Sequence, residues 1–285
     1  MRRGIFVLLA IFFLSANVAA QTLPRAEPVP GGIAVIQLTP ATAPPPRAFL
    51  NKERVMVIRQ RNDWYAVVGL PQSLLPGQHH LTTIEPSNQT VLYEFTVKPK
   101  EYGVQRITLK DKRLVEPNAD DLERITREQQ AIQAAYTQWI DVETPPLSFD
   151  FPVHGRLTGV FGTRRIFNGH ERQPHSGIDI AAPRGAAIVA PADGLVTGTG
   201  DYFFNGLTVF VDHGQGLVSM FNHLDRVAVE PGTKVKRGQL LGDIGSTGRA
   251  TGPHLHWSVS LNNVRVDPLL FVRKDAVKRL ALEGK

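Results

Sequence analysis

The chain of 285 residues contains no cysteine. This absence excludes disulfide bonds, and it also excludes a lipid anchor attached through a cysteine side chain. Long apolar runs are scarce too: after the first twenty residues, no stretch approaches the roughly 20 apolar residues that a membrane helix needs. Packing within the folded core must therefore stabilise the chain without covalent cross-links.

The first twenty residues have the pattern of a secretory signal. Arg2 and Arg3 form a positive start, Ile5–Leu14 is an unbroken apolar run, and Val18–Ala20 offers small residues for cleavage. The apolar run is too short to span a bilayer comfortably. We expect residues 1–20 to be a cleaved signal peptide that exports the protein to the periplasm, with an uncleaved anchor as the alternative.

The composition is that of a folded protein, with 42% hydrophobic and 20% charged residues. Its positive charge lies mainly in one half: residues 151–285 hold 16 basic and 11 acidic side chains, against 16 and 15 in residues 1–150. Such an excess suits an anionic partner, either nucleic acid or an anionic cell-wall polymer. A generally basic surface explains it equally well.

The first half, residues 21–115, alternates short β-type segments with turns, which favours a small β-sandwich-like domain. Its Pro-rich start, Pro24–Pro46, predicts extended loop around the strand-like Gly32–Leu38. The other expected strands are Val55–Ile58, Trp64–Leu70, His80–Ile84, Val91–Val97 and Gln105–Leu109.

A linker helix is expected within residues 116–146. Asn118 is placed to cap it, and Asp121 follows three residues later. Thr144-Pro145-Pro146 ends the linker, and we place the domain boundary there. We expect an apolar stripe at helical spacing to pack the two domains together. Its members are Leu122, Ile125, Ile132, Tyr136 and Trp139.

The second half, residues 147–285, has an almost purely β pattern, so the expected fold class of the chain is mostly β. Gly, Pro and Asp turns separate its Val- and Ile-rich segments. The expected strands are Ile188–Ala190, Leu195–Thr197, Thr208–Val211, Leu217–Phe221 and His254–Leu261.

Four histidines and one aspartate stand in short motifs of this half. His175 and Asp179 belong to P-H-S-G-I-D, His223 to F-N-H-L-D, and His254 and His256 to T-G-P-H-L-H-W. Imidazole and carboxylate bind catalytic zinc, typically as three protein ligands with one position open for water. The remaining two histidines would then serve as proton carriers. The pattern predicts a zinc hydrolase.

Backbone geometry constrains two of these pairs. In a straight strand His175 and Asp179 would lie about 13 Å apart. Zinc ligands lie only about 3 Å from one another, so the chain must bend, and Gly177 permits the bend. His254 and His256 can stay in one strand with both rings on the same face.

Each candidate also has an ordinary structural explanation. A histidine in a strand is often simply hydrogen-bonded, and Asp179 alone would suit a turn or a helix cap. We interpret His213, which lies where a strand enters a turn, as structural. The co-occurrence of the other five residues favours a metal site.

The stretch from about Phe161 to Asp267 resembles the lysostaphin/LytM-type zinc endopeptidases, which cut peptidoglycan peptides. The resemblance implies a LytM-type antiparallel sheet or half-barrel at residues 147–285. The matching motifs, in the order of the family, are F-G-T-R-R, P-H-S-G-I-D-I-A-A-P-R-G, V-D-H-G-Q-G-L, N-H-L, P-G-T-K-V-K-R-G-Q and G-S-T-G-R-A-T-G-P-H-L-H-W.

The resemblance also implies residue roles. His175, Asp179 and His256 would hold Zn2+, while His223 and His254 would act on the attacking water and the reaction intermediate. His254 is the preferred general base, although the sequence leaves the choice between the two open.

The expected activity is hydrolysis of peptide cross-links in peptidoglycan, at bonds that contain D-alanine. Peptidoglycan peptide stems, rather than nucleic acid, are the expected partner, with no stable membrane span after signal cleavage. The alternative is a silent or autoinhibited wall-binding protein that activates other cell-wall hydrolases. Arg164, Arg165 and Arg172 are candidates for binding a substrate carboxylate, with solvated loop charges as the preferred interpretation.

Overall fold

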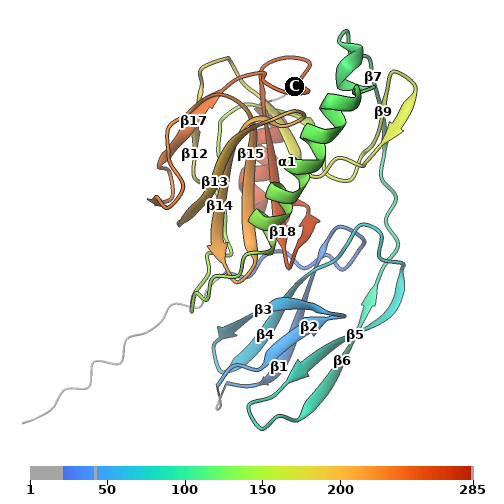
Figure 1. Ribbon diagram of the computed structural model, residues 1–285. Helices are drawn as coiled ribbons and strands as arrows, with labels where there is room; N and C mark the ends of the chain where they lie inside the picture. The colour runs from blue at the N-terminus through green and yellow to red at the C-terminus, as the bar shows by residue number, and fades with distance from the viewer. Residues whose placement is uncertain (1–21, 42–43, 284–285) are drawn as a thin grey trace, which may run out of the picture.

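The computed structural model describes residues 22–41 and 44–283. Two β-rich units follow one another along the chain, and helix α1 lies on the second of them (Figure 1). No helix in these ranges is both long and apolar enough to cross a membrane. The expected signal peptide, residues 1–20, lies outside the described residues.

The first unit is a six-stranded antiparallel sheet in the order β1-β4-β3-β2-β5-β6. One apolar cluster collects buried side chains from its strands, including Leu50, Val68 and Leu81. Strand β2 was not predicted from the sequence, because the Pro-rich run before it suggested a loop. The strands are β1 (Ile33–Pro40), β2 (Arg47–Leu50), β3 (Glu53–Gln60), β4 (Asp63–Gly69), β5 (Gly77–Ile84) and β6 (Thr90–Val97).

The second unit is a ten-stranded sheet with the path β16-β13-β14-β15-β18-β11-β8. Strand β17 joins β12 to β15, and β19 pairs with β18. This mostly β architecture confirms the predicted fold class. The strands are β8 (Arg156–Gly159), β11 (Ile178–Ala181), β12 (Ala187–Val189), β13 (Gly194–Tyr202), β14 (Gly206–Gly214), β15 (Leu217–Val227), β16 (Lys234–Val235), β17 (Leu240–Ile244), β18 (His254–Leu261) and β19 (Val264–Val266).

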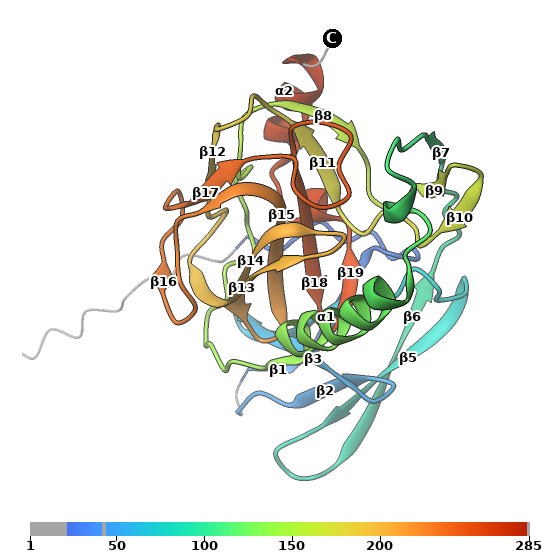
Figure 2. The ribbon, with the colours of Figure 1, turned by 45° about the horizontal axis from the view of Figure 1, so that its top comes forward.

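A small third sheet ties the segment between the first sheet and helix α1 to the second unit. Strand β7 (Val104–Ile107) pairs in parallel with β9 (Arg164–Phe167), which also pairs with β10 (His170–Arg172). We expected β7 within the first β domain, but it lies beside β9 and β10 instead (Figure 2). Ile107 and Phe167 share a small apolar cluster, which explains this placement.

Helix α1 (Ala119–Thr137) begins as predicted. Asn118 accepts a hydrogen bond from the Asp121 amide at 2.9 Å, and the Asp121 carboxylate accepts from the Asn118 amide at 3.3 Å. The predicted apolar stripe is wrong at both ends: Leu122 is 53% exposed, and Trp139 lies beyond the end of the helix. Helix α1 is held on the second sheet mainly by Tyr136, which packs on Phe210, Val218 and Met220. Helix α1 therefore covers the second sheet, while the contact with the first unit comes from Trp139 just beyond its end, whose ring centre lies 4.1 Å from the guanidinium carbon of Arg54.

The two units meet through sheet β1-β4-β3 itself. Ile33, Met56 and Val67 are fully buried and belong to the same cluster as Trp257 of the second unit. Asn262 seals the contact, because its side chain accepts from the Gly69 amide at 2.6 Å and donates to the Gly69 carbonyl at 3.1 Å. Burial of this apolar surface holds the units together.

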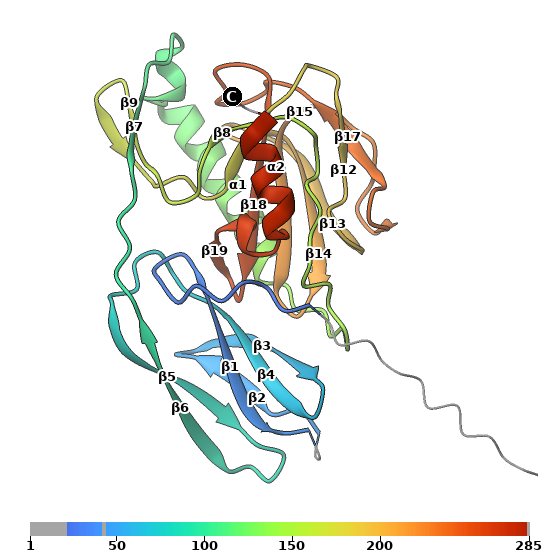
Figure 3. The same ribbon diagram turned by 180° about the vertical axis from the view of Figure 1, so that it is seen from behind.

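Helix α2 (Lys274–Glu283) corrects the expectation that the second half is almost purely β. Ala276 and Val277 pack against the main core on the side of the unit opposite α1 (Figure 3). Two short 3-10 helices complete the fold, η1 (Lys112–Leu114) and η2 (Pro268–Leu270).

Candidate metal centre

Two neighbouring strands bring the aspartate and the paired histidines together. Asp179 on β11 is the direct partner of His256 on β18, and Ala181 is the partner of His254. Side chains directly opposite on one sheet face lie within about 5.5 Å at their Cβ atoms. Leu255, between the two histidines, is fully buried on the other face, as the strand alternation predicts.

His175 stands just before β11 and is held by backbone hydrogen bonds. Its amide donates to the Thr163 carbonyl at 2.9 Å, and its carbonyl accepts from Gly162 at 2.8 Å. Gly177 follows where the chain passes close to β18, and a Cβ there would lie 2.3 Å from the Trp257 carbonyl oxygen. Glycine is needed for this close approach, not for a left-handed backbone conformation.

The three predicted ligands converge. His175 Nε2 lies 2.9 Å from both Asp179 Oδ1 and His256 Nδ1, and the latter two atoms are 2.8 Å apart. All three side chains are buried, and among the residues that the structure describes they form a cluster able to hold a metal ion.

The hydrogen bonds behind this cluster indicate its charge. His175 Nδ1 donates to the Val160 carbonyl at 2.9 Å, so in the neutral ring Nε2 presents a lone pair to the cluster. The Ser258 hydroxyl, 2.8 Å from His256 Nε2, can accept the proton of that ring in the same way. Two ring lone pairs and a carboxylate oxygen then meet, an arrangement that a cation stabilises. The donor set and its outer hydrogen bonds fit zinc.

Electrostatics favour the deprotonated forms that metal binding requires. Burial alone would raise the pKa of Asp179, but the neighbouring His175 and His256 hold it well below its ordinary value in the metal-free protein, where each ring can turn a proton, in place of its lone pair, toward the carboxylate. Burial lowers the pKa of His256 to about 4. Arg165 donates to the second carboxylate oxygen of Asp179 and so holds the carboxylate in place.

His223 reaches the site through an irregular stretch of β15. The register between β14 and β15 shifts at this point, and His223 has a φ of 67°. Bulges and left-handed residues of this kind re-aim side chains at functional sites. His223 Nδ1 donates to the Thr247 carbonyl at 2.8 Å, which leaves Nε2 free. Burial, together with His254 and His256, lowers the pKa of His223 to about 3.

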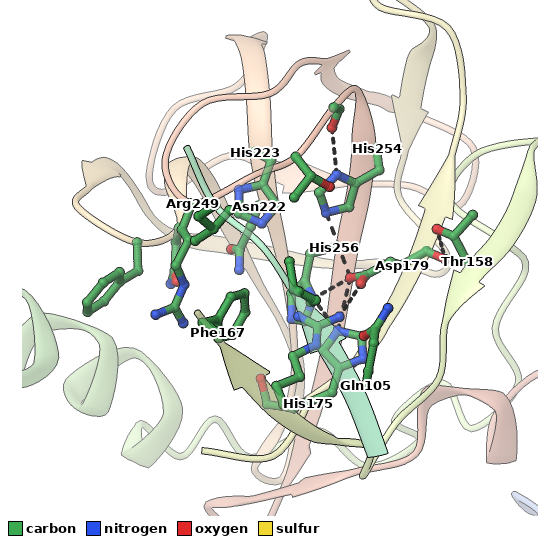
Figure 4. Close-up of a pocket in the computed structure, with 18 of the residues that line it drawn as sticks. Gln105, Thr158, Phe167, His175, Asp179, Asn222, His223, Arg249, His254 and His256 are labelled. Carbon is green, nitrogen blue, oxygen red and sulfur yellow. Dashed lines mark hydrogen bonds and ion pairs between the residues drawn. The ribbon is translucent and has the colours of Figure 1, made fainter. Parts of the chain in front are cut away.

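His254 completes the group of five. Its ring centre lies 4.8 Å from that of His223, and its Nε2 lies 3.9 Å from Asp179 Oδ1. His254 Nδ1 donates to the Gly252 carbonyl at 2.8 Å, so the proton-accepting Nε2 faces the cluster. Figure 4 shows both rings beside the three converging side chains. His213, by contrast, is hydrogen-bonded to the Asp193 carbonyl and the Ser219 hydroxyl, and it does not line this pocket.

The five residues line one cavity of about 480 Å³. One wall comes from strand β7 and the residues just after it, through Gln105, Ile107 and Leu109. Of the arginines considered from sequence, two are engaged away from Asp179: Arg164 pairs with Glu171, and Arg172 donates to the Val115 carbonyl.

Sequence reasoning missed a further arginine of this cavity. Arg249 lines the wall near His223 and Phe167 (Figure 4). Arg249 belongs to the motif G-S-T-G-R, shortly before H-L-H. The motif was used only as part of the family resemblance, and no feature of it identified the arginine as a residue of the cavity. The role of Arg165 as the partner of Asp179 was missed too, because no local spacing links residues 165 and 179.

Known proteins resemble both units. The model of peptidase family M23 matches residues 173–268, a range that contains all five site residues, and the M23 N-terminal domain matches residues 26–100. A crystal structure from Pseudomonas aeruginosa, described as a peptidase M23, is 44% identical with a TM-score of 0.73. The similarity covers 86% of this chain and 95% of that one.

Curated relatives match over a shorter stretch. The DD-carboxypeptidase/endopeptidase Mpg of Neisseria meningitidis is 38% identical over 117 residues, 41% of this chain and 27% of the relative. The peptidoglycan DD-endopeptidase ShyC of Vibrio cholerae is 37% identical over 114 residues, 40% of this chain and 26% of the relative. The chain thus matches about a quarter of the length of each. With the Pseudomonas structure matched almost end to end and both family models in sequence order, the chain belongs to peptidase family M23.

Proposed function

We propose that the protein is a zinc-dependent endopeptidase that hydrolyses peptide cross-links of peptidoglycan, at bonds that contain D-alanine. The observation that carries this proposal is the convergence of His175 Nε2, Asp179 Oδ1 and His256 Nδ1 within 2.9 Å, with two further imidazoles beside them. The name of the peptidoglycan DD-endopeptidase ShyC supports peptidoglycan as the substrate, and the name of Mpg supports endopeptidase activity. The pattern of residues 1–20 supports export to the periplasm.

A zinc ion held by His175, Asp179 and His256 would polarise the peptide carbonyl and lower the pKa of water. His254 is placed to accept the proton of the attacking water, because its Nε2 lies beside the ligand cluster and its Nδ1–H is fixed on Gly252. The proton that His254 has taken from the water would then pass to the leaving amine. His223 is neutral with its proton on Nδ1 in the metal-free protein, and it would stabilise the negative charge on the substrate oxygen after taking up a second proton at Nε2.

Digestion of purified wall sacculi tests the proposal directly. The protein should dissolve the sacculi by separating the glycan strands from one another, a chelator should stop this, and added zinc should restore it. The products, separated by chromatography, should be intact glycan strands that carry peptide stems without cross-links. Unchanged digestion in the chelator would refute metal dependence, and released sugars without cut peptides would refute the reaction.

An autoinhibited form is the second candidate, and one observation favours it. Strand β7 forms a wall of the cavity and is held on β9 by parallel pairing. If long substrates enter across this wall, β7 must move before the wall polymer can reach the metal centre.

A further inference from the structure

Arg249 occupies an unusual place in the cavity wall. Its guanidinium carbon lies 4.6 Å from the ring centre of Phe167 and 4.3 Å from that of Phe204. Its amide donates to the Phe204 carbonyl at 2.8 Å, which fixes the backbone beneath it. A guanidinium lying over a ring still has its N–H donors, because these lie in its own plane. The two rings therefore hold the cation without occupying its hydrogen bonds.

Within the described residues the guanidinium of Arg249 has no hydrogen bond or ion pair. The other three arginines near the cavity are engaged, Arg165 with Asp179, Arg164 with Glu171 and Arg172 with a backbone carbonyl. Burial, with repulsion from Arg165 and Arg172, lowers the pKa of Arg249 to about 10, so the side chain remains cationic at neutral pH. A partly buried cation without a counter-charge is unfavourable in the free protein, which suggests that a ligand supplies the anion.

The net charge of the cavity lining also favours an anionic ligand. Among the described residues that line the cavity, Asp179 is the one carboxylate, and both of its oxygens are engaged, by the two histidines and by Arg165. Arg165 and Arg249 leave the lining with an excess positive charge before any metal ion is added. An anionic group on the substrate would be drawn to Arg249, whose planar fork matches a carboxylate in two parallel hydrogen bonds.

We propose that Arg249 is a specificity-determining residue that binds a free carboxylate of the peptide close to the bond that is cut. The substrate class is then cross-linked peptides that carry an ionised carboxylate on a residue next to the scissile amide. This inference rests on the proposed function. Two carboxylates fit the chemistry: the one on the residue that provides the leaving amine, and the one at the end of the neighbouring peptide stem.

Paired synthetic peptides test the proposal. A cross-linked peptide is prepared in its free-acid form and in two forms with one or the other carboxylate converted to an amide. The wild-type protein should cut the free acid more efficiently than one amide by about 10- to 100-fold in kcat/KM, as expected for charge-assisted hydrogen bonds. The amide that loses efficiency identifies which carboxylate Arg249 binds.

Arg249→Gln should bring the ratio of kcat/KM for acid and amide close to one, and Arg249→Lys should restore part of it. Arg164→Gln is the matched control, since Arg164 is paired with Glu171 on an exposed strand, and it should keep the wild-type ratio. Zinc content and melting temperature are measured for each variant to confirm folding.

A purely structural role would lower the rates on acid and amide equally in Arg249→Gln, and that result would overturn the proposal. Equal cleavage of acid and amide by the wild type would overturn it too. If the wild type cuts none of these peptides, the proposed function fails. In that case the affinities of the same peptides for the wild type and for Arg249→Gln, measured by calorimetry, still test the role of Arg249. Equal affinities of the wild type for acid and amide would refute carboxylate binding by Arg249.

Discussion

His254 and His256 project from one face of β18, yet their ring nitrogens meet different surroundings. His256 points Nδ1 at Asp179 and His175, whereas His254 fixes Nδ1 on Gly252 and leaves Nε2 toward the cavity. Strand alternation alone placed both rings on one face. The direction of each ring came from tertiary hydrogen bonds that the H-x-H spacing does not encode.

This difference makes the two histidines a matched pair for mutation. His256→Ala should lose zinc and activity together, because it removes one of three ligands. His254→Ala should keep zinc and lose about 10²- to 10⁴-fold in kcat, the range for loss of a general base. Metal analysis and sacculus digestion on the same samples check both. Full zinc occupancy in His256→Ala would remove it from the ligand set, and wild-type turnover in His254→Ala would assign the base to His223.

At the scale of elements, β7 is where sequence and structure differ most. Its segment was recognised as a strand, but its partner was not, because β7 and β9 lie about sixty residues apart and no turn signal connects them. Helix α1 likewise has local features that the sequence predicted and tertiary contacts that it did not. Its capping residues Asn118 and Asp121 are local and were predicted, whereas its packing on Phe210 and Met220 was not.

The absence of native cysteine allows a clean test of whether β7 moves. Val104 and Arg164 are directly paired on β7 and β9, so Val104→Cys with Arg164→Cys should form one disulfide across them. If substrate enters by lifting β7, the oxidised variant should lose most of its sacculus digestion and regain it in reductant.

The control is the exposed pair His80→Cys with Glu94→Cys on β5 and β6, where a disulfide should leave digestion unchanged. Equal rates for oxidised and reduced forms of the β7 variant, with the disulfide verified by mass, would show that β7 is a fixed wall and would refute the autoinhibited form.

At the scale of the whole molecule, stability should depend on the buried carboxyl of Asp212. One of its oxygens accepts from the Gly214 amide at 2.7 Å, and the other has no partner among the described residues. Burial raises the pKa of Asp212 to about 6, opposed by the Gly214 hydrogen bond. The folded state thus binds this proton more tightly than the unfolded chain, and the free energy of unfolding should fall as pH rises from about 4 to about 6.

Asp212→Asn should remove that part of the pH dependence. Between pH 4 and pH 7 the free energy of unfolding of the wild type, relative to the variant, should fall by about 1–3 kcal/mol, since one pKa unit corresponds to roughly 1.4 kcal/mol. Denaturant titrations of metal-free protein at both pH values measure this, with Asp201→Asn, an exposed site, as control. A difference that stays constant with pH would show that Asp212 does not titrate in this range.

The sequence by itself determined what depends on residue type and short spacing: a mostly β chain, the capped helix start, and the five histidine and aspartate side chains suited to a metal centre. Tertiary structure alone decided the rest. Phe167 and Phe204 both lie against the guanidinium of Arg249. A register shift turns His223 toward the cavity, and β7 forms one of the cavity walls. The physical reason is that local periodicity fixes which face a side chain takes, whereas burial and pairing between distant segments fix what it meets there.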